Sequence, residues 1–142
     1  MTKLFAFIVT FPLAFILFVK AVAFYDFDTK QRYLQNSADL LAYKAQITGV
    51  VTSSEMTEFQ SKASSLLNDA SVSVAYSVGI DPAGNGNITW STYSPGTQMT
   101  KGQYFKIYVV GGQSLYSKAQ VGKSSPDKVH YKAKSVVRVE KL

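Results

Sequence analysis

LFAFIVTFPLAFILFVKAVAFY, residues 4–25, is an apolar stretch in which Lys20 is the only charged residue. A helix needs about 20 apolar residues to cross the hydrocarbon core of a bilayer. Residues 4–25 therefore predict a helix that can span a membrane, provided that Lys20 reaches the interface or meets a carboxylate. Pro12 removes one backbone donor and is expected to loosen or kink the helix.

The apolar stretch leads directly into a second helical segment. Residues 26–47 contain neither Gly nor Pro and are rich in helix-forming residues. Their spacing predicts one buried stripe, formed by Leu34, Ala38, Leu41 and Ala45. With Gly49 as the C-terminal cap, we expect one continuous helix over residues 2–48, on the order of 70 Å long.

Three interpretations fit the N-terminal segment. The first is a secretory signal, because Lys3 precedes the apolar run and Ala21-Val22-Ala23 forms an A-x-A cleavage site. The second is a plain transmembrane anchor. The third is a helix that crosses the membrane before assembly and packs in a filament core afterwards, which the unbroken continuation beyond residue 25 favours.

The middle of the chain predicts a short second helix. Thr52 and Glu55 have the spacing of a capping box. The helix is expected to continue to about Leu67, with Asn68-Asp69 as its stop. Its apolar face is predicted to contain Met56, Phe59, Ala63, Leu66 and Leu67.

The remainder alternates with a period of two, which is typical of strands. Four strands are predicted: residues 72–80, 88–93, 104–110 and 129–139, separated by turns at 81–87, 94–96 and 124–127. Val72 to Ile80 should place every second residue on a buried face, and Gly111-Gly112 should end the third strand.

The predicted fold class is α+β: a long N-terminal helix, a short helix and an antiparallel sheet of about four strands. The sheet should pack on the distal half of the long helix and on the short helix. We divide the chain into an apolar helix half (1–25), an amphipathic helix half with the short helix (26–70) and a β-rich surface head (71–142).

The net charge of +6 is concentrated at the C-terminal end. Residues 1–100 carry six Lys and Arg against seven Asp and Glu, whereas residues 101–142 carry nine against two. The neutral interpretation is a solvated face of strands. The functional one is a polyanion-facing surface that contacts nucleic acid, an anionic cell-wall polymer or acidic neighbouring subunits. Its candidate residues are Lys101, Lys106, Lys128, Lys132, Lys134 and Arg138.

Signals for catalysis and for metals are weak. The chain has no Cys, and its single His, His130, lies in a predicted strand. Asp81 to Asn87 is similar to a calcium loop but lacks the oxygen ligand at its third position, so a hairpin turn explains these residues better. We therefore predict no catalytic residues, no metal and no cofactor, and expect that the protein is not an enzyme.

The apolar helix with Pro12 near its middle, followed by RYLQNSADLLAYKA at residues 32–45, resembles TadE-like pseudopilins and related pilin-like bacterial proteins. The resemblance implies a pilin-like fold and a structural subunit of a pilus-like filament. Such a subunit is inserted in the cytoplasmic membrane before assembly and then polymerises with copies of itself at the cell surface. The implied assembly residues are Leu4, Phe7, Phe11, Pro12, Phe15, Phe18, Lys20 and Val22.

The sequence departs from that family at one position. Type IV pilins and TadE-like proteins usually carry a Glu near the start of the apolar helix, and residues 4–8 contain no carboxylate. We hypothesise that Lys20 substitutes for it by pairing with Asp26 or Asp28 of a neighbouring subunit, because a buried unpaired ammonium is costly. Two alternatives are a membrane-anchored, non-polymerising component of a secretion or conjugation machine, and a secreted polyanion-binding domain cleaved at Ala23.

Overall fold

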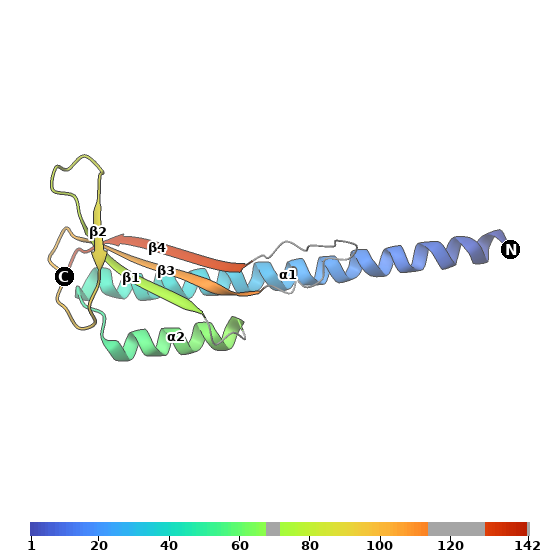
Figure 1. Ribbon diagram of the computed structural model, residues 1–142, viewed down its shortest axis with the longest axis horizontal. Coiled ribbons are helices and arrows are strands. Elements are labelled where there is room, and N and C mark those ends of the chain that lie inside the picture. Colours follow the sequence, from blue (N-terminus) through green and yellow to red (C-terminus); the bar gives the residue numbers. More distant parts are fainter. Residues whose placement is uncertain (68–71, 114–129, 142) are drawn as a thin grey trace.

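The computed structural model describes residues 1–67, 72–113 and 130–141. Its elements are α1 (Thr2–Thr48), α2 (Ser53–Leu67), β1 (Ser73–Ile80), β2 (Thr89–Thr92), β3 (Tyr104–Gln113) and β4 (His130–Arg138). The predicted α+β layout is confirmed, including the continuous first helix, which runs through Pro12. Figure 1 shows the distal half of α1 beside the sheet and α2, whereas its N-terminal half extends beyond both.

Both predicted helix boundaries depend on local hydrogen bonds. Gly49 adopts φ 73°, and its N–H donates to the carbonyl of Ala45 at 2.8 Å, which ends α1. The capping box at the start of α2 also forms. The Glu55 N–H donates to Thr52 Oγ1 (3.2 Å), and the Thr52 N–H donates to Glu55 Oε2 (3.3 Å).

The four strands form one antiparallel sheet in the order β2-β1-β3-β4. The pairs Ala75↔Tyr108 and Tyr108↔Lys134 fix the register across the three longer strands. α1 contacts β4 and β3, and α2 contacts β3 and α1, so both helices pack on the same side of the sheet. The other side is covered by no described helix or strand.

The core lies between the sheet and the helices. From the strands it takes Phe105, Ile107, Val109, Tyr131 and Ala133, all at most 2% exposed. α2 adds Phe59, Ala63 and Leu67, as predicted. The buried stripe of α1 is Leu34, Ala38, Ala42 and Ala45. Leu41, which was predicted in the same stripe, packs against the core but is only partly buried, because it lies at the groove beside α2.

Two strand predictions also need correction. Gly111 does not end the third strand, because β3 continues to Gln113 through a register irregularity between Gly111 and Gln113. A Cβ on Gly111 would lie 2.8 Å from the Cα of Val72, so the glycine permits a close backbone approach. Ile80 is 48% exposed rather than buried, since it is the last residue of β1 before the turn. The predicted stop at 68–69 and turn at 124–127 lie outside the described residues.

Two glutamines of α1 cover the free edge of β4. Gln31 donates from Nε2 to the carbonyl of Lys132, and its Oε1 accepts the Lys132 N–H at 3.1 Å. Gln35 makes the same pair of bonds to Lys134, at 2.8 and 3.2 Å. Unpaired backbone groups of an edge strand are a template for pairing with another chain. The two amide side chains occupy four of these groups.

Replacing both glutamines, Gln31→Ala with Gln35→Ala, is expected to lower the free energy of unfolding by about 2 kcal/mol, because four partly solvated hydrogen bonds are lost. The exposed edge should also promote aggregation. Urea unfolding and light scattering of the full-length protein in detergent micelles measure both effects. Ser61→Ala, on an exposed position of α2, is the control. A double variant that is as stable and as soluble as Ser61→Ala would contradict this role.

Candidate functional site, an exposed apolar face of the long helix

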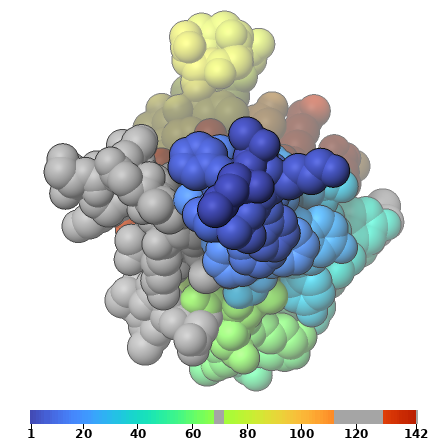
Figure 2. Space-filling model, turned by 90° about the vertical axis from the view of Figure 1, so that its right-hand side faces the viewer, coloured from blue at the N-terminus to red at the C-terminus, as the bar shows by residue number. Residues whose placement is uncertain are grey.

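The first half of α1 is apolar and uncovered. α1 is the one helix among the described residues that is long and apolar enough to cross a membrane. The mean hydropathy of its 18-residue apolar stretch is 2.4, and none of that stretch is buried. Figure 2 looks onto its N-terminal end, which projects in front of the head. Six of the predicted assembly residues are between 46% and 65% exposed: Leu4, Phe7, Phe11, Phe15, Phe18 and Val22.

These six residues share one side of the helix, and that side continues into the head. Tyr25, Tyr33, Leu40 and Tyr43 are 58–73% exposed and extend the same spacing of three or four, with the exposed Thr29 and Asn36 between them. At 3.6 residues per turn, all these positions fall within an arc of about 80°. We call the ten apolar and aromatic residues the exposed stripe: Leu4, Phe7, Phe11, Phe15, Phe18, Val22, Tyr25, Tyr33, Leu40 and Tyr43.

The exposed stripe lies opposite the face of α1 that packs on the sheet. Leu34, Ala38 and Ala45 point to the core, and the residues of the exposed stripe are roughly half a turn away from them on the helix. In the N-terminal half, the rings of Phe7 and Phe11 already stack along it, with centroids 5.6 Å apart. The prediction from sequence contained the first six residues of this surface and missed Tyr25, Tyr33, Leu40 and Tyr43.

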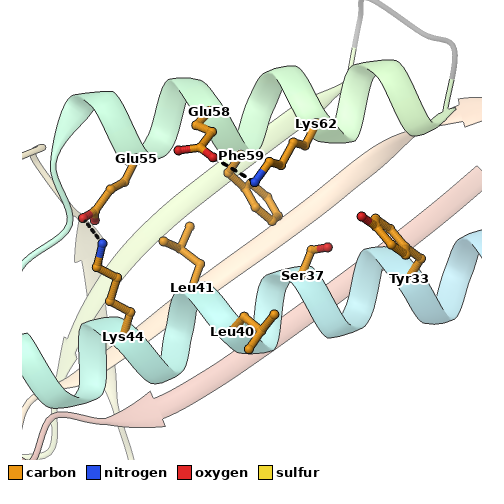
Figure 3. Close-up of a pocket in the computed structure, with 9 residues that line it drawn as sticks. All are labelled: Tyr33, Ser37, Leu40, Leu41, Lys44, Glu55, Glu58, Phe59 and Lys62. Atoms are coloured by element: carbon orange, nitrogen blue, oxygen red, sulfur yellow. Dashed lines mark hydrogen bonds and ion pairs between the residues drawn. The ribbon is translucent and has the colours of Figure 1, made fainter.

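A groove between α1 and α2 adjoins the distal part of the exposed stripe (Figure 3). It has a volume of about 310 Å³, and Tyr33 and Leu40 line it together with Phe59 from α2. Two ion pairs border it. Lys44 bridges the helices to Glu55 at 2.5 Å, and Lys62 pairs with Glu58 at 2.8 Å within α2. This neighbouring Lys62 ammonium lowers the pKa of Glu58. The groove therefore combines an apolar wall with charges that are already paired.

The charged residues predicted near the membrane boundary pair within the chain. Asp26 lies 3.4 Å from Lys30, and Asp28 lies 3.0 Å from Arg32, each one turn further along α1. Lys20 is exposed. Pairing of Lys20 with a carboxylate of another subunit stays a prediction. It requires Asp26 to share or release Lys30, or Asp28 to share or release Arg32.

The predicted polyanion residues divide into three groups. Lys106 of β3 and Lys132, Lys134 and Arg138 of β4 lie on the side of the sheet that faces away from the helices. Lys101 is exposed in the turn before β3. Lys128 lies outside the described residues.

The described residues show no arrangement typical of metal binding. No group of three or more His, Asp or Glu that could hold a metal ion occurs among them. The carboxylate of Asp81 accepts the N–H groups of Asn85 (3.2 Å) and Gly86 (2.8 Å), which closes the turn between β1 and β2. Comparison with protein-family models, curated proteins and solved structures gives no match to this chain.

Burial raises the pKa of two tyrosines. The pKa of Tyr76 rises to about 12, and its hydroxyl has no hydrogen-bond partner among the described residues. Burial and the nearby Asp26 charge raise the pKa of Tyr131. Perturbed groups often mark catalytic sites, but the Tyr76 ring packs on Phe105 in the core, with centroids 6.4 Å apart. Burial against the core therefore accounts for the raised pKa of Tyr76.

The stability of the head is expected to fall as the pH rises from about 10 to about 12. Unfolded Tyr76 loses its proton near pH 10, whereas folded Tyr76 keeps it until about pH 12, so the folded state binds more protons in this window. Tyr131 acts in the same direction. In urea unfolding from pH 8 to 11.5, the free energy of unfolding of Tyr76→Phe should fall less than that of the unmodified protein. Equal falls in the two proteins would contradict a raised pKa of Tyr76 in the folded state.

Proposed function

We propose that this protein is a structural subunit of a pilus-like filament, polymerising through α1 and presenting the sheet at the cell surface. The observation that carries the proposal is the length of the exposed stripe. From Leu4 to Tyr43 it extends over about 60 Å at 1.5 Å per residue, whereas the hydrocarbon core of a bilayer is about 30 Å thick. Lipid can therefore cover only about half of it.

The uncovered remainder lies beside the head. Tyr33, Leu40 and Tyr43 are all at least 58% exposed, and such a row of large apolar groups at helical spacing favours packing against another helix. The α1 of a second copy suits this surface, because it carries a matching row along its whole length. Burial of both rows provides the driving force for polymerisation once the subunit leaves the membrane.

The test is electron microscopy of material sheared from producing cells, combined with the intact mass of the subunit in the same fraction. We expect filaments whose subunit retains residues 4–25. A membrane-embedded particle of defined size, with no filaments, would instead favour the non-polymerising component of a secretion or conjugation machine. A soluble monomer that begins at Phe24 would overturn the proposal, because the apolar segment would then be a signal peptide.

A further inference from the structure

The outer face of the sheet, on the side away from α1 and α2, is both basic and aromatic. Strand alternation and the cross-strand pairs place two small residues of β1 in its middle, between the larger side chains of β3 and β2. Residues at the centre of this face include Ala75, Ser77, Trp90, Lys106, Tyr108 and Lys134.

A hollow lies at the centre of this face. Ala75 and Ser77 of β1 line it together with Lys106, Tyr108 and Lys134, and its volume is about 270 Å³. The hollow arises from the register, because the small residue Ala75 is paired directly with Tyr108, and Tyr108 with Lys134. Tyr108 is 37% exposed, so its ring is available at the side of the hollow.

An aromatic platform lies next to the hollow. The indole of Trp90 covers Gly79, where an added Cβ would lie within 2.9 Å of two ring carbons. Lys106 Nζ lies 4.3 Å from the centroid of the same ring, a cation–π contact. Trp90 is the single tryptophan of the chain, so its fluorescence reports on this face alone.

The positive charge of the outer face is not compensated by described neighbours. All four ion pairs within the described residues are formed by residues of the two helices. Strands β1 to β4 contain no Asp or Glu. Lys132, Lys134 and Arg138 are exposed on β4, and alternate residues of a strand are about 6.7 Å apart.

Protection of the sheet edge does not explain these lysines. Lysines on an edge strand can discourage pairing with other chains, but Gln31 and Gln35 already occupy the edge groups of Lys132 and Lys134. Lys106 lies on β3, which is an interior strand. Edge protection therefore does not account for the cations.

We propose that the outer face of the sheet binds single-stranded nucleic acid. The phosphates follow the row of cations on β4, and a base enters the hollow and stacks on Tyr108. Single strands are bound in general by a positive surface that follows the backbone together with aromatic rings on which the bases stack. An anionic polymer without bases would use the cations but would gain nothing from the exposed tyrosine. The inference does not depend on polymerisation of the chain.

The first experiment measures fluorescence anisotropy of a labelled 15-nucleotide oligothymidylate with the full-length protein in detergent micelles, together with Trp90 fluorescence. We expect binding that weakens as salt rises. Removing three cations (Lys132→Ala, Lys134→Ala, Arg138→Ala) should weaken it about tenfold or more and reduce the slope of log K against log salt by about 2. Lys30→Ala, Arg32→Ala and Lys62→Ala together remove the same charge from the helices and should change binding little. Absence of binding, or equal losses in both triple variants, would overturn the proposal.

The second experiment separates nucleic acid from other polyanions. Tyr108→Leu should weaken oligothymidylate binding about tenfold, because a stacked ring is lost, whereas Tyr108→Phe should retain it. Circular dichroism of each variant verifies the fold. Inorganic polyphosphate at equal charge should compete poorly. Equal competition by polyphosphate, with no effect of Tyr108→Leu, would mean that the face recognises charge alone. That result would overturn the nucleic-acid inference in favour of an anionic polymer.

Discussion

Replacement of Phe105 by alanine is expected to lower the free energy of unfolding by about 3–5 kcal/mol, the usual cost of removing a large aromatic side chain from a core. Phe105 is fully buried in β3. Its ring stacks on Tyr76 and meets Tyr93 edge-on, with centroids 5.4 Å apart in the second pair. Because a domain of this size is stable by only about 5–15 kcal/mol, the variant should lie close to the limit of folding.

Urea unfolding of the full-length protein in detergent, followed by near-ultraviolet circular dichroism, measures this loss. Tyr108→Ala is the matched control, since Tyr108 belongs to the same strand but lies on the outer face and is 37% exposed. Its expected cost is about 1 kcal/mol or less. Similar losses in both variants would mean that the two faces of β3 are not divided into core and surface as described.

Features that depend on neighbouring residues were predictable from the sequence. The C-terminal cap at Gly49 and the capping box of Thr52 and Glu55 consist of hydrogen bonds between residues at most four positions apart. The absence of Gly and Pro from residues 26–47 was enough to predict a single helix. The period-two alternation likewise located all four strands.

Features that depend on distant residues were not predictable. The pairing of Gln31 with the backbone of Lys132 joins positions 101 residues apart, and nothing near Gln31 indicates it. Ala42 is buried and Leu41 only partly so because of where the sheet lies. A small residue on that side of α1 allows β4 and β3 to approach the helix. The third strand was predicted to end at Gly111, but this glycine lies inside β3 and permits a close contact with Val72.

The candidate site was only partly recognised, for a related reason. The apolar residues up to Val22 are conspicuous, whereas the polar residues Thr29 and Asn36 interrupt the row in the distal half. The signal that would have found Tyr33 and Leu40 is the shared spacing of three and four. It became decisive only when the packed side of α1 was known, because the exposed side is then its opposite.

Replacement of Leu40 by aspartate is expected to reduce filament yield about tenfold or more without unfolding the head. Leu40 is 71% exposed, so the isolated subunit tolerates a carboxylate there. In an assembled interface the same carboxylate would be buried without a partner, which costs several kcal/mol. The measurement is the amount of sheared filament relative to subunit in the membrane fraction, with circular dichroism of the purified variant to verify its fold.

Two controls make the Leu40 result specific to the exposed stripe. Leu40→Met preserves an apolar side chain and should retain filaments, and Ser54→Asp places the same charge on the exposed first turn of α2 and should also retain them. If Leu40→Asp assembled normally, the distal part of the exposed stripe would not be an interface. Only the apolar segment of residues 4–25 would then need a cover, and a bilayer alone supplies that. The length of the stripe would then no longer favour polymerisation.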